Sequence, residues 1–283
     1  MASIKDITLG QYYPTESVIH RLDPRVKLVV TLGYILSLFL ITTVPGYLLA
    51  ALFLILWTGL SRVPLRFMLR GMKAVFLLLV LTIVFNLFLT PGEVLFRFWK
   101  LSVTREGLRT ASLMATRLVF LIVGSSVMTF TTTPNHLTDG MESLMHPLKR
   151  LHFPVHEIAM MMSIALRFIP ILMEETDKIM KAQMARGADF ESGGIIRRAK
   201  NLVPLLVPLF ISAFRRANDL AIAMEARCYR GGAGRTKMKP LIYQTRDLVA
   251  YGLLLLYLVL SVVIGRDLLH LQNLLTGVLA WRI

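Results

Sequence analysis

The sequence predicts an all-α integral membrane protein with about five transmembrane helices and a cytoplasmic coupling region of long, proline-bent helices. Of its 283 residues 55% are hydrophobic, and the mean hydropathy is +0.63, whereas an ordinary soluble domain is about 45–50% apolar. Several apolar runs approach the roughly 20 residues that a membrane-spanning helix needs. Between the last two runs lies a long basic segment that fits neither a span nor a short loop.

Five apolar stretches predict the membrane spans. They are Val26–Thr43, Gly46–Leu60, Lys73–Leu89, Leu108–Phe130 and Leu248–Ile264. The second reaches spanning length only when it begins at Pro45 and continues to Val63. We interpret Leu268–Trp281 as an interfacial helix or a partial sixth span.

The positive charges of the loops set the predicted orientation. The segment after the second span contains Arg62, Arg66, Arg70 and Lys73 and no acidic residue, and cytoplasmic loops carry such an excess of cations. The N-terminus and the central basic segment are then also cytoplasmic, whereas the loop Pro91–Thr104 and the C-terminus lie outside. We therefore divide the chain into N-terminal spans over 1–130, cytoplasmic or membrane-surface coupling helices over 131–247, and a C-terminal span with its tail over 248–283.

The formal net charge of +15 indicates an acidic or anionic binding partner. In a soluble protein it would indicate nucleic acid, but the cations here are not interleaved with the aromatic residues that stack on bases. Cytoplasmic loops, anionic lipid or an acidic protein account for the same charge. We predict contact with the lipid bilayer, with the tract Arg230–Lys239 against anionic headgroups, and no binding of nucleic acid.

Nucleotide and metal chemistry is not expected in this chain. The sequence contains no Gly-x-x-x-x-Gly-Lys-Ser/Thr loop, so it should not bind ATP through a P-loop. Its one cysteine, Cys228, excludes an internal disulfide and a cysteine-based metal site. His152 and His156 have the four-residue spacing of helical metal ligands, but Pro154 between them disfavours a shared helix face. We predict no catalytic residue, no metal site and no cofactor.

The central segment predicts one short and two long helices, because a stretch of more than about 15 residues without secondary structure is rare in a compact protein. The helical patterns cover Pro134–His146, His156–Arg186 and Ile195–Arg227. A proline inside a helix removes a hydrogen bond and kinks or breaks the helix. We therefore expect the first helix to be followed by Pro147 and Pro154, the second to be kinked at Pro170, and the third to be broken at Pro204 and Pro208.

Both long helices end in the same short motif. One closes with Ala182-Gln183-Met184-Ala185-Arg186-Gly187 and the other with Ala223-Met224-Glu225-Ala226-Arg227-Cys228. The helix dipole and the terminal carbonyls explain a single arginine at a helix C-terminus. Two arginines behind the same small residues predict two docking points, because a guanidinium pairs bidentately with a carboxylate. Two such points would couple the chain to a dimeric or pseudo-dimeric partner.

The third residue of the two motifs differs. Gly187 adopts a left-handed conformation without a steric penalty, whereas Cys228 does not. We therefore expect the first helix to stop at Gly187 and the second to run past Arg227 to Gly231. The two docking points would then differ in shape, as two non-identical partner subunits would require.

Arg117 lies in the middle of the fourth predicted span. Ionisable residues at membrane depth are costly and often functional. Four explanations remain open: Arg117 faces the interior, pairs with a carbonyl, contacts a partner subunit, or lies near an interface because the span is shifted.

Two further stretches complete a recognisable pattern. One is Tyr13-Pro14…Ser17…His20-x-Leu22-Asp23-Pro24-Arg25-x-Lys27-Leu28, and the other is Leu137-x-x-Gly140-Met141-x-x-Leu144-x-x-Pro147-Leu148-x-x-Leu151-x-x-Pro154. With these and the two arginine motifs, the chain resembles the transmembrane (T) components of energy-coupling factor transporters, which import vitamins and metal ions. The resemblance covers Ile4 to about Gly265. Ala185-Arg186-Gly187 matches the family motif fully, whereas Ala226-Arg227-Cys228 has Cys in place of Gly.

The resemblance implies a non-catalytic coupling subunit in the cell (inner) membrane of a bacterium or archaeon. Arg186 and Arg227 would occupy grooves on two ABC-type ATPase subunits, identical or not, and those subunits would bind ATP and magnesium. A separate substrate-binding membrane subunit (S component) would pack against the chain and carry a vitamin or other micronutrient. Further structural or partner contacts are expected at Asp23, Arg25, Gly140, Pro147, Pro170 and Arg117.

Three other functions are weighed against this one. A dedicated cobalt- or nickel-uptake subunit of the same fold is not separated from it by the sequence. A polytopic membrane enzyme would need a cluster of acids, histidines or a nucleophile, which the sequence does not indicate. A secondary transporter would need carboxylates within its spans to carry a proton or sodium ion, and the predicted spans lack them.

Overall fold

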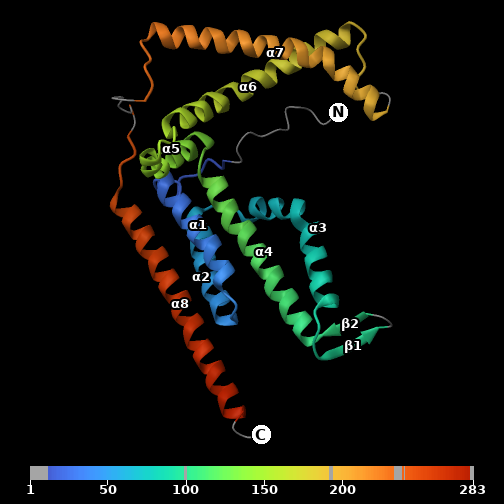
Figure 1. Ribbon diagram of the computed structural model, residues 1–283, viewed down its shortest axis with the longest axis vertical. Coiled ribbons are helices and arrows are strands. Elements are labelled where there is room, and N and C mark those ends of the chain that lie inside the picture. Colours follow the sequence, from blue (N-terminus) through green and yellow to red (C-terminus); the bar gives the residue numbers. More distant parts are fainter. Residues whose placement is uncertain (1–11, 99–100, 191–193, 233–237, 239, 281–283) are drawn as a thin grey trace. The chain divides into compact units, whose positions relative to one another are not determined.

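The computed structural model describes residues 12–98, 101–190, 194–232, 238 and 240–280. The chain forms two compact units (Figure 1). The bundle unit comprises the described residues of 12–140 and 241–280, and the helix-pair unit comprises those of 141–240. The chain therefore leaves the bundle unit within one short helix and returns to it just before the last helix.

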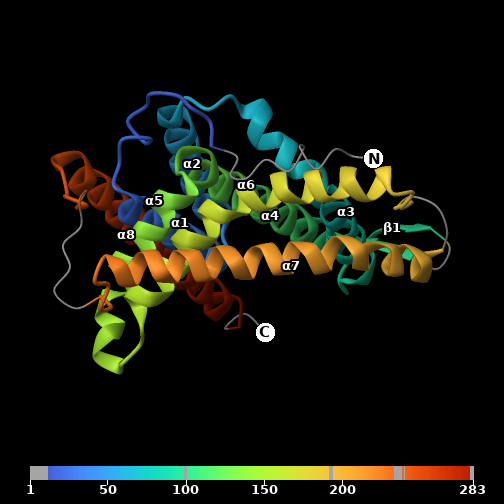
Figure 2. The same ribbon diagram turned by 90° about the horizontal axis from the view of Figure 1, so that it is seen from above.

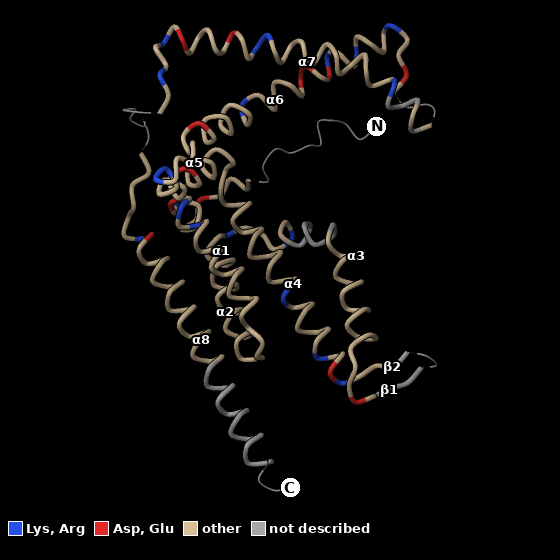
Figure 3. Tube along the Cα trace, in the orientation of Figure 1, with Lys and Arg blue, Asp and Glu red and all other residues tan. Residues whose placement is uncertain are grey.

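The bundle unit is built from the five helices that the apolar stretches predict. They are α1 (Pro24–Leu40), α2 (Val44–Ser61), α3 (Leu65–Leu89), α4 (Arg105–Thr131) and α8 (Thr245–Ala280). Figure 3 shows α2 without charged residues, and the sequence of α8 carries none over 248–265. The all-α membrane fold is confirmed. The tail from Leu268 does not form a separate element, because the helix α8 continues to Ala280, and Trp281 lies outside the described residues.

Four helices are long and apolar enough to cross a membrane. They are α2, α4, the Thr245–Gly265 part of α8, and α6 of the helix-pair unit, and Val75–Leu89 in α3 is a shorter apolar segment. α1 has 17 residues, which is fewer than the roughly 20 of a full span. The helix α6 satisfies the same measure although the sequence places it among the coupling helices.

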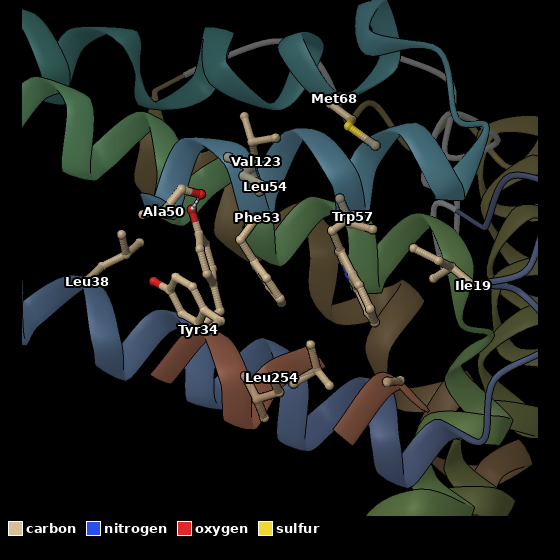
Figure 4. Close-up of a cluster of buried hydrophobic side chains, with 14 of the residues drawn as sticks. Ile19, Tyr34, Leu38, Ala50, Phe53, Leu54, Trp57, Met68, Val123 and Leu254 are labelled. Atoms are coloured by element: carbon tan, nitrogen blue, oxygen red, sulfur yellow. Dashed lines mark hydrogen bonds between the residues drawn. The ribbon is translucent and has the colours of Figure 1, made fainter. Parts of the chain in front are cut away.

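Aromatic rings fill the core of the bundle (Figure 4). Phe53 of α2 stacks on Tyr257 of α8 with ring centroids 4.6 Å apart, and on Trp57 at 6.0 Å. Tyr34 of α1 lies 5.6 Å from Phe53. The hydroxyls of Tyr257 and Ser37 are 2.7 Å apart, so the polar end of this buried ring is satisfied inside the bundle.

A β-hairpin replaces the loop predicted over Pro91–Thr104. Its strands are β1 (Val94–Phe98) and β2 (Leu101–Thr104), paired antiparallel with Val94 opposite Thr104. Thr104 also caps α4, because its Oγ1 accepts from the Gly107 amide at 3.0 Å and donates to the Thr90 carbonyl at 2.8 Å. The hairpin thus joins the ends of α3 and α4.

The helix-pair unit consists of two long antiparallel helices, seen from above in Figure 2. They are α6 (Val155–Ala185) and α7 (Ile195–Ala226), and they follow α5 (Pro134–Met145) and the 3-10 helix η2 (His146–Leu151). Glu175 of α6 accepts from Arg216 of α7 at 3.1 Å. Nearer the loop that joins the two helices, Gln183 donates to the Pro204 carbonyl at 3.3 Å.

The predicted breaks at Pro204 and Pro208 are wrong, because α7 runs unbroken through both prolines; α6 likewise continues through Pro170. The nitrogen of Pro208 cannot donate to the carbonyl four residues earlier, which is that of Pro204. Gln183 supplies the missing donor from α6. A side chain of the neighbouring helix therefore compensates for the lost backbone bond.

Candidate docking site

The two arginine motifs have the same backbone geometry. Ala185 and Ala226 are the last helical residues, and the arginines that follow them cap the helices. Arg186 has φ −87° and ψ 5°, and Arg227 has φ −91° and ψ 14°. The next residue is left-handed in both, with φ +87° at Gly187 and +55° at Cys228. We call Ala185-Arg186-Gly187 and Ala226-Arg227-Cys228 the helix-end motifs.

The terminal hydrogen bonds of α6 and α7 also match. In α6 the Gly187 amide donates to Met184 O at 2.9 Å, and the Ala188 amide to Gln183 O at 3.0 Å. In α7 the equivalent bonds run from Cys228 to Glu225 at 2.8 Å and from Tyr229 to Met224 at 3.0 Å. This pair of bonds is the Schellman motif, which satisfies carbonyls that a helix end leaves free.

The expected extension of α7 to Gly231 is therefore wrong. Cys228 takes the left-handed conformation in spite of its Cβ, and the helix ends at Ala226. A left-handed residue other than glycine costs roughly 1–2 kcal/mol. The two terminal hydrogen bonds offset that cost, so the two helix-end motifs have the same backbone shape.

All six residues of the helix-end motifs are exposed. A Cβ built on Gly187 meets nothing within 4 Å, so this helix end is slim enough for a groove wall to approach. Because α6 and α7 are antiparallel, the motifs lie at opposite ends of the pair. From the Gln183–Pro204 contact, α7 continues for 22 positions to Ala226, so roughly 33 Å of α7 lies between this contact and the second motif.

In the bundle unit, the N-terminal motif forms an ionic cluster around the first turn of α1. Asp23 caps the helix by accepting from the Arg25 amide at 2.9 Å, and it pairs with the Arg25 guanidinium at 2.7 Å. Both side chains are largely buried, at 3% and 12% exposure. The Arg25 guanidinium also lies 3.8 Å from the centre of the Tyr243 ring, a cation–π arrangement that favours the charged form.

Two buried charges tie other elements to this turn. Asp247, in the first turn of α8, accepts from the Asp23 amide at 2.9 Å and from the Gln244 amide at 2.8 Å. The Lys27 ammonium donates to the Thr131 carbonyl at the end of α4, at 2.8 Å, and to the His20 carbonyl at 3.1 Å. Sequence reasoning missed Asp247, although an acid in the first turn of the cleanest apolar helix is a recognised helix-start signal.

Gly140 of α5 packs against the same turn. A Cβ at this position would lie 3.1 Å from Pro24 Cβ and 3.3 Å from the Arg25 nitrogen, so only a glycine allows this approach without displacing backbone. The structure thereby brings together Asp23 and Arg25 of one predicted motif and Gly140 of another. We call the group Asp23, Arg25, Lys27, Thr131, Gly140 and Asp247 the α1 cluster.

The surroundings of two residues near α1 fix their protonation. Burial raises the pKa of Asp23, but the hydrogen bonds and the charge of Arg25 outweigh burial and bring that pKa below its usual value. Burial lowers the pKa of His20, and the charge of Lys27 lowers it further. The His20 Nε2–H donates to the Tyr13 carbonyl at 3.0 Å, and Nδ1 accepts from Ser17 Oγ at 2.7 Å. The lowered pKa favours the neutral form of the His20 imidazole near neutral pH.

Arg117 pairs with a carbonyl, one of the four explanations left open by the sequence. Its Nη2 donates to the Ile41 carbonyl at 3.0 Å, and its Nε donates to the Tyr47 hydroxyl at 3.0 Å. Ile41 is the C-cap of α1, so the guanidinium neutralises the negative end of that helix dipole. The charge in the middle of α4 thus stabilises the turn between α1 and α2.

Similar proteins place the chain in a family. The family model described as "Cobalt transport protein" (CbiQ) matches residues 15–238. A relative from Thermosediminibacter oceani is 56% identical over 248 residues, which is 88% of this chain and 94% of the relative. One from Bacillus subtilis is 49% identical over 240 residues, or 84% and 91%. Each of the two is named as an energy-coupling factor transporter transmembrane protein, EcfT.

The chain belongs to the CbiQ/EcfT family. It is therefore a transmembrane component of an energy-coupling factor transporter, as the sequence motifs indicate. The family match contains both helix-end motifs and most of the α1 cluster, and it ends before Asp247.

Other predicted positions of this EcfT-family chain have separate surroundings. Pro147 lies exposed in the first turn of η2, and Pro170 lies exposed inside α6. His152 has φ +58° between η2 and α6, whereas His156, in α6, pairs with Glu142 at 3.1 Å. The two histidines thus do not share a helix face. Within the described residues, no three His, Cys, Asp or Glu side chains lie close enough to hold a metal ion.

Proposed function

We propose that this chain is the non-catalytic coupling subunit of an ATP-driven importer in a bacterial or archaeal cell membrane. The helix pair would lie on the cytoplasmic side and dock on two ABC-type ATPases, which would bind ATP and magnesium. The observation that carries the proposal is the matched geometry of two exposed arginines at opposite ends of one antiparallel helix pair.

Each docking contact would be an arginine–carboxylate pair. The guanidinium of Arg186 or Arg227 presents a planar fork that fits a carboxylate bidentately. Removing one partner of a desolvated pair of this kind costs roughly 2–5 kcal/mol. Two contacts at opposite ends of the helix pair would transmit a change in the distance or angle between two ATPase subunits, whereas one contact would allow the helix pair to swivel.

The apolar faces of the helix pair support a membrane-level partner. Large apolar side chains are exposed along both helices, and a continuous apolar surface of this kind marks contact with protein or lipid. They include Met161, Met162, Leu202, Val203, Leu206, Val207, Phe210, Ile211 and Phe214. An S component that binds a vitamin or another micronutrient would pack on this surface and be reoriented when the helices move.

A dedicated cobalt- or nickel-uptake subunit is the second candidate. It is favoured by the description of the matching family model, "Cobalt transport protein". Mass spectrometry of the membrane subunits that co-purify with the chain separates the two candidates. A single dedicated metal-uptake subunit would support the second, and a vitamin-binding subunit the first.

The decisive experiment reverses both docking charges. Arg186→Glu with Arg227→Glu should abolish ATP-driven uptake and release the ATPases from the purified complex, because each carboxylate would then face another. Arg215→Glu is the matched control, since Arg215 is also an exposed arginine on α7 but lies outside the helix-end motifs. Retention of both the ATPases and uptake in the double variant would rule out the docking role.

A further inference from the structure

The helix pair contains a cavity that the docking proposal does not use. It has a volume of about 620 Å³ and lies between the N-terminal half of α6 and the C-terminal end of α7. The residues that line it are Met160, Ser163, Ile164, Arg167, Phe168, Leu220, Met224, Arg227, Cys228, Tyr229, Arg230 and Gly231. Every one of them belongs to the helix-pair unit.

One side of the cavity is apolar and extends along the helices. Ile164, Phe168, Leu220 and Met224 line both this cavity and a neighbouring one of about 230 Å³. The second cavity reaches further between α6 and α7, to Leu172. Together they form an elongated apolar groove, a shape that fits a hydrocarbon chain.

The larger cavity is cationic. Arg167, Arg227 and Arg230 line the larger cavity, and its described lining residues include no carboxylate. None of the three arginines forms an ion pair within the described part of the chain. Three guanidinium groups that have no ion-pair partner among the described residues and that line an apolar groove make a site for an anionic amphiphile.

We propose that this groove binds an anionic phospholipid, with its phosphate at Arg167, Arg227 and Arg230 and an acyl chain along α6 and α7. The sequence after the cavity favours lipid over an acidic protein segment. Residues 230–239 contain two arginines and two lysines and no acid, a composition that anionic membrane surfaces attract. Large apolar side chains along α7 are also exposed, and acyl chains would cover them.

The lipid would add a function to the second helix-end motif. Its phosphate would hold Arg227 from the side of the groove, while the ATPase carboxylate of the proposed function approaches from outside. Anionic lipid would then regulate one docking point and leave Arg186 unaffected. The lipid proposal does not depend on the docking proposal, and experiment can disprove either one without affecting the other.

Cys228 provides the test, because it lines the cavity and is the only cysteine in the sequence. The full chain is placed in nanodiscs of phosphatidylcholine, with or without phosphatidylglycerol, and the rate of Cys228 labelling by an uncharged maleimide is measured. Phosphatidylglycerol should slow labelling. Because a cation near an anionic lipid contributes about 1 kcal/mol, Arg167→Gln or Arg230→Gln should each raise the half-protecting lipid fraction about fivefold.

Controls separate occupancy of the groove from a general surface effect. Arg215→Gln removes an exposed α7 arginine outside the cavity and should leave protection unchanged. A cysteine at exposed Asn218, introduced as Asn218→Cys with Cys228→Ser, should label equally fast in both lipids. A photoactivatable phosphatidylglycerol should crosslink to peptides that contain residues 160–168 or 220–231.

Four results would overturn the lipid proposal. The first is equal labelling of Cys228 in the two lipids. The second is equal protection by glycerol phosphate, which has no acyl chain. The third is equal slowing of the cysteine at position 218, and the fourth is the absence of photocrosslinks to residues 160–168 and 220–231. Loss of lipid protection in Arg167→Gln with intact ATPase binding would support the lipid site and leave the docking proposal standing.

Discussion

At the scale of single residues, the amide of Gln183 explains how α7 tolerates Pro208. Its Nε2 donates to the Pro204 carbonyl, which lost its own donor to Pro208. Gln183→Leu should destabilise the helix pair by about 1 kcal/mol, the net value of a typical hydrogen bond. Thermal unfolding of the purified chain in detergent measures this loss.

A double-mutant cycle makes that expectation specific. Pro208→Ala restores a backbone donor to the Pro204 carbonyl, so Gln183→Leu should cost little in that background. An equal loss with and without Pro208 would mean that Gln183 stabilises the pair through some other contact.

His20 gives the fold a dependence on pH. Its folded pKa lies below the ordinary value of about 6.5, so the unfolded chain binds a proton first as the pH falls. Stability should therefore be complete above about pH 6.5 and decline below it, by at most about 1.4 kcal/mol per pH unit from this group.

The expected pH effect is measured by unfolding His20→Gln and the parent chain between neutral and mildly acidic pH. His20→Gln should be the less pH-dependent of the two, and His136→Gln, which changes an exposed histidine, should behave like the parent. Equal acid sensitivity in His20→Gln would show that other groups control the decline.

The residue scale also shows where sequence reasoning stops. Asp23, Arg25 and Gly140 could be selected from motifs, because each belongs to a recognisable stretch. Asp247 carries a helix-start signal, but its contact could not be predicted, since its partner amide belongs to a residue 224 positions earlier in the chain. The sequence likewise left the partner of Arg117 open, because the Ile41 carbonyl that it binds belongs to the end of another helix, α1.

At the scale of elements, the ends of α6 and α7 are set by hydrogen bonds more than by residue preference. The conformational cost at Cys228 predicted a longer helix, but the two terminal bonds were the larger effect. Cys228→Gly should stabilise the chain by about 1 kcal/mol, and Gly187→Ala should destabilise it by a similar amount, as read by thermal unfolding.

A matched glycine controls this pair of substitutions. Gly194 lies at the start of α7 with an ordinary φ of −69° and open space around it. Gly194→Ala should therefore leave stability almost unchanged. If Gly187→Ala behaved in the same way, the left-handed conformation would not be the reason for glycine there.

Apolar periodicity was sufficient to predict the long helices but not the short elements. Three bundle helices and both members of the helix pair lie within a few residues of the predicted ranges, whereas α3 begins eight residues earlier and α8 ends sixteen residues later than predicted. The hairpin over 94–104 was missed because its strands have only five and four residues, too few to show a reliable alternation. The break at Pro208 was mispredicted because the compensating donor lies on another helix.

At the scale of the whole molecule, the chain enters and leaves the helix-pair unit next to the same turn of α1. On the way out of the bundle, Gly140 of α5 packs on Pro24 and Arg25. On the way back, Asp247 at the start of α8 binds the Asp23 amide. The sequence analysis divides the chain after residues 130 and 247. The structure divides it after residues 140 and 240, which is near the same two places along the chain.

The α1 cluster should therefore decide whether motion of the helix pair reaches the bundle. Asp247→Ala leaves the Asp23 and Gln244 amides without their acceptor, at a cost of roughly 1–3 kcal/mol for each buried donor. In reconstituted vesicles we expect the ATPases to remain bound and to hydrolyse ATP, while uptake per ATP falls severalfold. Asp247→Asn retains one acceptor oxygen, so its uptake per ATP should lie between that of the parent chain and that of Asp247→Ala.

Glu16→Gln is the matched control for this last expectation, because Glu16 is an acid of the N-terminal segment with 87% of its side chain exposed. It should leave the ratio of uptake to hydrolysis unchanged. A parallel loss of uptake and ATPase binding in Asp247→Ala would mean that the cluster only maintains the fold. A lowered ratio with an intact complex would instead assign the α1 cluster to transmission, because the two helix-end motifs would still be engaged.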